Sequence, residues 1–137
     1  MLALEVLHGR RIVAAPAALD AAQWPEGATI LRFAPDDVFV LGVAHGDHGD
    51  AGDAGDVDVA GEHVIVADEC GFVGCWLDAE ARRVVSRHIE WPLPAERPAL
   101  AQGYVAGVPA KLYLAESGET LLLCAAAYAV DLMERLS

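Results

Sequence analysis

The fold is decided by the last third of the sequence, residues 99–137, which read ALAQGYVAGVPAKLYLAESGETLLLCAAAYAVDLMERLS. Two apolar runs, 100–106 and 109–115, flank the dipeptide Gly107-Val108. Their β-branched, aromatic and leucine side chains suit a pleated, half-buried surface better than a helix. The pattern therefore predicts two strands joined by a hairpin turn at Gly107-Val108.

The remainder of this segment predicts a third strand and a closing helix. A turn is expected at 116–119, where Gly118 can adopt a positive φ, and the continuous apolar run 120–124 is typical of a strand inside a sheet. From residue 125 the apolar spacing becomes helical. The face predicted to be buried consists of Ala125, Ala129, Leu132, Met133 and Leu136.

The middle of the chain predicts further strands. Residues 29–33 and 38–43 predict a buried hairpin, because the proline and paired aspartates at 34–37 are strong turn formers. Residues 64–66 and 72–77 are also strand-like. The polar stretch that separates these two apolar runs lies either between two strands or within one long strand.

The N-terminal residues give a less regular pattern. Apolar runs at 2–7 and 12–15 surround the sequence His-Gly-Arg-Arg at 8–11, which indicates either a hairpin or an irregular arm. A short helix is predicted to begin in the segment 16–22, because proline is tolerated in a first helical turn.

A longer helix is predicted at 78–90. Asp78 suits its N-cap, since a carboxylate accepts backbone N–H groups of the first turn. The Trp-Pro-Leu-Pro sequence at 91–94 is expected to end it, with Trp91 as a packing anchor and His88 partly buried at the helix end. These elements predict an α+β fold with a mixed, mainly antiparallel sheet and two main helices in a single domain, residues 1–137.

Composition limits the classes of partner. A chain of 137 residues fits one domain, and a second independent core is not expected. The net charge of −12 repels phosphate backbones and anionic membranes, so we predict neither a nucleic-acid nor a membrane partner. No apolar run approaches the roughly 20 residues that a bilayer requires, and Arg10 and Arg11 interrupt the order of a signal peptide. We therefore predict a cytoplasmic protein.

The segment 45–58 is a candidate metal site. It reads HGDHGDAGDAGDVD, so that Asp47, Asp50, Asp53 and Asp56 recur every third residue near His45 and His48. Carboxylates and imidazoles are plausible metal ligands. The spacing matches neither the twelve-residue calcium loop nor the nonapeptide calcium repeat, and ordering so many glycines is costly. We therefore predict a mobile Gly/Asp loop at 45–58 and keep metal binding as the alternative.

The three cysteines, Cys70, Cys75 and Cys124, are predicted to be buried small hydrophobes rather than a disulfide framework. A structural metal bound by Cys70 and Cys75 with His63 or His88 is the alternative. The sequence contains no Gly-x-Ser-x-Gly elbow, local cysteine-protease signature or phosphate-binding glycine loop. We therefore predict no catalytic, cofactor-binding or metal-ligating residue in this chain.

The succession of elements from 29 to 136 resembles the gamma subunit of heterotetrameric sarcosine oxidase and, more distantly, the folate-binding domain of glycine-cleavage aminomethyltransferases. The likeness rests on the Pro-Asp turn before an apolar strand, the helix leading to the proline-rich segment 91–94, and the segments 101–112 and 128–136. The Gly/Asp loop is extra, and no aspartate matches the catalytic one of the aminomethyltransferases.

The resemblance implies a fold like that folate-binding domain. It also implies a non-catalytic accessory subunit, packed on larger flavoprotein subunits of a heteromeric amine oxidase complex. FAD, FMN, NAD or folate would then belong to the partner subunits, with none bound by this chain. The alternatives are a stand-alone protein that binds a folate-like small molecule, or a metal-binding protein. A small-molecule site would need a concave pocket with a few polar groups.

Overall fold

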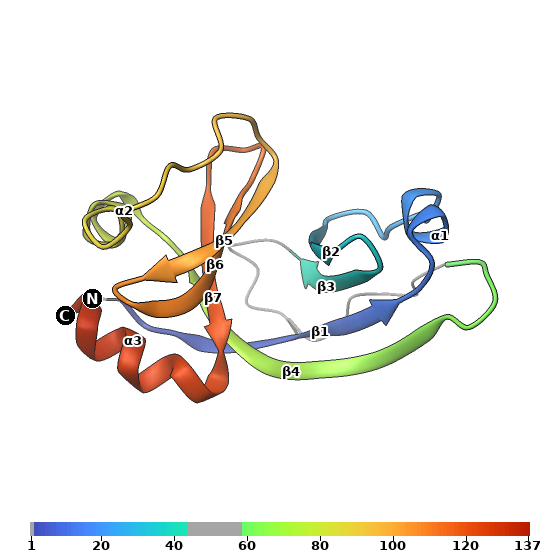
Figure 1. Ribbon diagram of the computed structural model, residues 1–137, viewed down its shortest axis with the longest axis horizontal. Coiled ribbons are helices and arrows are strands. Elements are labelled where there is room, and N and C mark those ends of the chain that lie inside the picture. Colours follow the sequence, from blue (N-terminus) through green and yellow to red (C-terminus); the bar gives the residue numbers. More distant parts are fainter. Residues whose placement is uncertain (1, 44–58) are drawn as a thin grey trace. The chain divides into compact units, whose positions relative to one another are not determined.

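A computed structural model describes residues 2–43 and 59–137 (Figure 1). The chain forms two compact units. The C-terminal unit comprises Met1–Val6 and Gly71–Ser137, and the N-terminal unit comprises Leu7–Cys70. Strands β1 (Glu5–Val13) and β4 (Ile65–Trp76) contribute residues to both units. The prediction of a single domain stays a prediction.

The C-terminal unit contains four neighbouring strands in the order β4-β7-β6-β5, and the pairs β4–β7, β7–β6 and β6–β5 are all antiparallel. The strands β5, β6 and β7 and the closing helix were predicted from the segment 99–137 and are confirmed. The elements that follow β4 are α2 (Ala79–Ser86), β5 (Ala99–Val105), β6 (Val108–Leu114), β7 (Thr120–Ala125), the 3-10 turn η1 (Ala126–Tyr128) and α3 (Ala129–Leu136).

The core of the C-terminal unit follows the strand and helix periods. Alternate residues of β6 are buried and join buried residues of β7, Val85 of α2, and Leu132 and Leu136 of α3. Met133 was predicted to be buried with them, and this prediction is wrong, because its side chain is 38% exposed. The helix begins only at Ala129, and Met133 lies about 100° around it from Leu132.

Two boundaries in this unit differ from the prediction. The hairpin turn is centred on Ala106 and Gly107 rather than on Gly107-Val108, and both residues have positive φ, 51° and 76°. A two-residue turn with two positive φ values matches the twist of the paired strands. Helix α2 ends at Ser86 rather than at residue 90, because the chain turns and the His88 carbonyl accepts a hydrogen bond from the Ala106 N–H at 2.9 Å.

In the N-terminal unit the strand order is β2-β3-β1, with antiparallel pairing throughout. The predicted hairpin of β2 (Ala28–Ala34) and β3 (Asp37–Val43) and the short helix α1 (Pro16–Asp20) are confirmed. The predicted hairpin or irregular arm at 2–15 is wrong, because β1 runs unbroken through 8–11. A Cβ atom on Gly9 would collide with the Val40 carbonyl and the Phe39 ring, so this glycine permits close strand pairing instead of making a turn.

The polar stretch 68–71 lies within strand β4, which confirms one of the two alternatives. Glu69 accepts a hydrogen bond there from Arg11 at 2.9 Å, while Arg11 also forms a double hydrogen bond with Asp37 at 2.5 and 2.6 Å. Each unit has its own cluster of buried apolar residues. The first half of β4 is largely exposed.

Candidate functional site in the C-terminal unit

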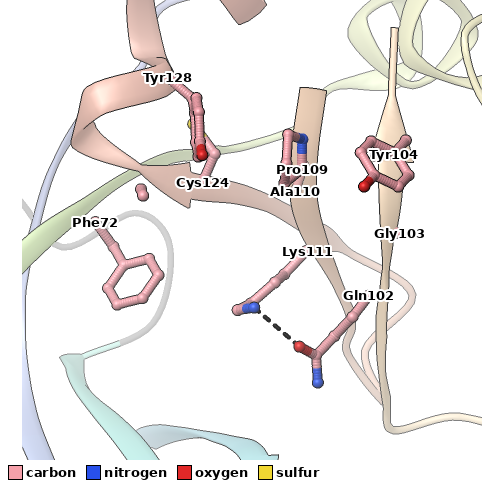
Figure 2. A pocket seen from close by; sticks show the side chains of 10 residues that line it. Phe72, Gln102, Gly103, Tyr104, Pro109, Ala110, Lys111, Cys124 and Tyr128 are labelled. Atoms are coloured by element: carbon pink, nitrogen blue, oxygen red, sulfur yellow. Dashed lines mark hydrogen bonds between the residues drawn. The ribbon is translucent and has the colours of Figure 1, made fainter. Parts of the chain in front are cut away.

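An open pocket of about 420 Å³ lies over β5, β6 and β7 of the C-terminal unit (Figure 2). Its lining combines one cation, one amide, two phenols and several apolar groups. The lining residues are Phe72, Gln102, Gly103, Tyr104, Pro109, Ala110, Lys111, Cys124, Ala125 and Tyr128.

The polar part of the pocket is a lysine and a glutamine on neighbouring strands. Gln102 of β5 lies directly opposite Lys111 of β6 in the antiparallel register. Lys111 Nζ donates a hydrogen bond to Gln102 Oε1 at 2.9 Å, and Figure 2 shows both side chains extending toward the side on which Phe72 lies. The hydrogen bond positions the ammonium group beside the amide. The pair places a cation and an amide side by side in the pocket lining.

The aromatic part of the pocket is exposed. Tyr104 is 63% exposed and Tyr128 is 42% exposed, and Figure 2 shows them on either side of Pro109 and Ala110. Amphipathic rings of this kind bind flat ligands or the apolar side chains of a partner. The pocket therefore offers binding chemistry, with a cation and aromatic faces.

Trp91 supports the β5 wall of this pocket from the adjoining segment. Its indole Nε1 donates a hydrogen bond to the Tyr104 carbonyl at 2.8 Å. The ring lies so close to Gly103 that a Cβ atom there would be 2.6 to 2.8 Å from three ring atoms. The prediction that Trp91 is a packing anchor is therefore confirmed.

The cysteines differ in their surroundings. Cys124 is buried, Cys75 is half-buried and Cys70 is exposed, so the prediction of burial is wrong for Cys70. Burial, together with Asp78 and Glu5, raises the pKa of the Cys75 thiol to about 11, and burial also raises the pKa of Cys124. Both thiols are thus protonated and weakly nucleophilic near neutral pH.

The structure does not bring the candidate metal ligands together. Cys70 and Cys75 are five residues apart in the extended strand β4, which corresponds to roughly 16 Å at the usual rise per residue. Within 2–43 and 59–137, no group of three or more His, Cys, Asp or Glu side chains could hold a metal ion. His63 is exposed and His88 is half-buried. The predicted Gly/Asp loop at 45–58, with its histidines and aspartates, lies outside the described residues.

Sequence reasoning missed the Lys111–Gln102 pair and the two tyrosines. The pairing could have been found from the hairpin itself, because Gln102 and Lys111 are equally distant from the turn at Ala106-Gly107. The placement of Tyr128 beside the hairpin depends on tertiary packing, for which the local sequence carries no signal.

The sequence matches no protein-family model, and no curated protein matches it. The fold class is α+β, with a mainly antiparallel sheet and few helices. None of the helices in the described part of the chain has the length and apolar character needed to cross a membrane.

Proposed function

We propose that this chain is a non-catalytic accessory subunit of a flavin-dependent heteromeric amine oxidase complex resembling sarcosine oxidase. The observation that supports this most is a set of large apolar side chains exposed on the C-terminal unit. Tyr104, Tyr128 and Val130 are 63%, 42% and 68% exposed. Tyrosine is enriched at protein interfaces, and Tyr104 and Tyr128 line the same pocket.

These side chains belong to the segments that carry the resemblance to the sarcosine oxidase gamma subunit. Tyr104 lies within 101–112, which contributes to the hairpin of β5 and β6, and Tyr128 and Val130 lie within 128–136, which includes α3. A fold like the aminomethyltransferase folate-binding domain is part of the same proposal. FAD, FMN, NAD or folate would be bound by the larger partner subunits, and this chain would pack against them.

A specific observation favours a second candidate, a stand-alone protein that binds a folate-like molecule. The pocket combines Lys111 and Gln102 with the exposed rings of Tyr104 and Tyr128. An ammonium group can pair with the carboxylates of such a ligand, and aromatic side chains can stack on its flat ring system. The metal-binding alternative rests on 45–58 and gains no support from the described residues.

Affinity purification of the tagged chain from its native host tests the first candidate. We expect larger subunits to co-elute, with the visible absorption spectrum of bound flavin and with activity that oxidises sarcosine or a related secondary amine. Replacing Tyr104 and Tyr128 together by serine should release these subunits. Leu93→Ser is the matched control, because Leu93 is 41% exposed but does not line the pocket.

A colourless chain that elutes alone would contradict the accessory-subunit proposal. The second candidate is tested by titrating the purified chain with a reduced folate while Trp91 fluorescence is followed, in a variant where Trp24 and Trp76 are phenylalanine. Saturable quenching that Lys111→Met abolishes supports a folate-like ligand. Equal responses of the Lys111→Met variant and its parent would exclude the pocket as the binding site.

A further inference from the structure

A second hollow of about 570 Å³ lies within the C-terminal unit and is lined by helices α2 and α3. We call it the α2–α3 groove. Its apolar lining is formed by Ala81 and Val84 of α2, by Met133 and Leu136 of α3, and by Leu2. It is distinct from the pocket of Lys111 and Tyr128, since the two share no lining residue.

The groove exists because each helix has more apolar surface than the core covers. In α2, Val85 is buried in the core, while the adjacent Val84 and the preceding Ala81 are only half-buried. In α3, Leu132 is fully buried, whereas the next residue, Met133, is 38% exposed. Residues three apart lie on one side of a helix, so Ala81 and Val84 line one wall and Met133 and Leu136 line the other.

The groove carries acidic side chains. Asp78, Glu80 and Glu134 are among its lining residues, and among the described residues that line it there is no lysine, arginine or histidine. Asp78 accepts the N-cap hydrogen bond from the Ala81 N–H at 2.7 Å. Asp78 and Glu80 are exposed, as is Glu134. An apolar groove with an acidic rim is complementary to an apolar surface with a basic rim.

We propose that the α2–α3 groove docks an amphipathic helix of a partner protein, with an apolar stripe flanked by lysine or arginine side chains. Helices α2 and α3 have eight residues each and are therefore about 12 Å long, which matches about two turns of a docked helix. Apolar residues at positions i, i+3, i+4 and i+7 would enter the groove, and the basic residues would face the three carboxylates.

The charge argument selects this occupant over two others. A second copy of the chain would itself bring a net charge of −12 and the same acidic rim. An anionic lipid surface would be repelled by the three carboxylates. The inference rests on the proposed function, because the docked helix is assigned to a larger subunit of the same complex.

The probe is a labelled model peptide, an amphipathic helix with a leucine stripe flanked by lysines, whose binding is followed by fluorescence anisotropy. A second peptide carries glutamate at every lysine position. We expect the lysine peptide to bind at least tenfold more tightly than the glutamate peptide. The difference should shrink as salt is added, because exposed charges are screened.

Variants of the full chain locate the binding surface. Replacing Glu80 and Glu134 together by lysine should weaken binding of the lysine peptide by about tenfold, since two charge attractions become repulsions. The matched control replaces Glu90 and Glu96 by lysine; both are exposed and neither lines the groove. This control makes the same change in net charge and should bind the lysine peptide almost as well as the natural chain.

The inference would be overturned by equal binding of the two peptides or by no binding of either. It would also be overturned if the two double variants weakened binding of the lysine peptide equally. Self-association that Met133→Lys abolishes would also overturn it, because the groove would then be occupied by a second copy. If the Glu80→Lys, Glu134→Lys variant still recovers the flavoprotein from the native host, the groove proposal fails while the proposed function stands. If the lysine peptide binds but no flavoprotein is recovered from the native host, the proposed function fails while binding at the groove stands.

Discussion

Replacing Gly103 by alanine tests how the wall of the pocket is built. Gly103 lies in β5 opposite Ala110 of β6, and the Trp91 ring packs directly against it. An added Cβ atom would lie 2.6 Å from Trp91 Cε2, 2.7 Å from Cζ2 and 2.8 Å from Nε1. Real Cβ atoms essentially never approach other atoms this closely, so the indole ring has to move.

The expected loss of stability follows from three contributions. Forcing an extra carbon into a packed contact typically costs about 1–3 kcal/mol. Moving the ring also weakens its hydrogen bond to the Tyr104 carbonyl, now 2.8 Å, and a hydrogen bond contributes about 0.5–1.5 kcal/mol. Alanine offsets part of this, since glycine inside a strand is about 0.5–1 kcal/mol less favourable. We expect Gly103→Ala to lower the unfolding free energy by about 1–3 kcal/mol.

Urea denaturation followed by far-UV circular dichroism measures this change, and a second background isolates its cause. In Trp91→Leu the large ring is absent, so Gly103→Ala should then have a much smaller effect. The two substitutions would show strong coupling in a double-mutant cycle. An equal loss in both backgrounds, or no loss in the natural chain, would refute the packing argument.

Three further predictions concern stability. Asp78→Ala should lower the unfolding free energy by about 0.5–2 kcal/mol, because it removes the N-cap hydrogen bond of α2. Asp78→Asn should retain most of the stability, and equal losses for the two variants in urea denaturation would contradict the capping role. Arg11→Met should lower the unfolding free energy by about 1–3 kcal/mol, because the Asp37 and Glu69 carboxylates lose their charge-assisted hydrogen bonds. Arg11→Lys should recover only part of this loss, and full recovery would show that the double hydrogen bond to Asp37 contributes nothing. Burial and nearby carboxylates raise the pKa of Cys75 from 9.0 to about 11, so the unfolded chain loses the thiol proton at a lower pH than the folded chain. The unfolding free energy should therefore fall as the pH rises between these values. An equally steep fall in a Cys75→Ala variant would exclude this thiol as the cause.

Local patterns predicted most of the fold because each one has a direct physical cause. The β-branched, aromatic and leucine side chains of β5 and β6 and the continuous apolar run in β7 identified strands, and Asp78 identified the start of α2. The errors arose where a tertiary contact overrides a local signal. Gly9 resembles a turn residue, but it lies within β1 because the neighbouring strand approaches too closely for a side chain.

The candidate site was harder to predict than the fold. Lys111 and Gln102 are 9 residues apart, and only the register of the hairpin brings them together. The α2–α3 groove depends on which side of each helix the core leaves exposed, as the misassignment of Met133 illustrates. Periodicity identifies an amphipathic helix, but tertiary packing decides which side of it meets the core.

The measurement that tests the accessory-subunit proposal most directly is sedimentation velocity of the tagged chain purified from its native host. Sedimentation is followed both by protein absorbance and in the visible absorption band of flavin. We predict one boundary, far larger than a 14.4 kDa chain, that carries both signals, and a shift of the chain to a small, colourless boundary when Tyr104 and Tyr128 are replaced by serine. A small, colourless boundary for the natural chain would contradict the proposal.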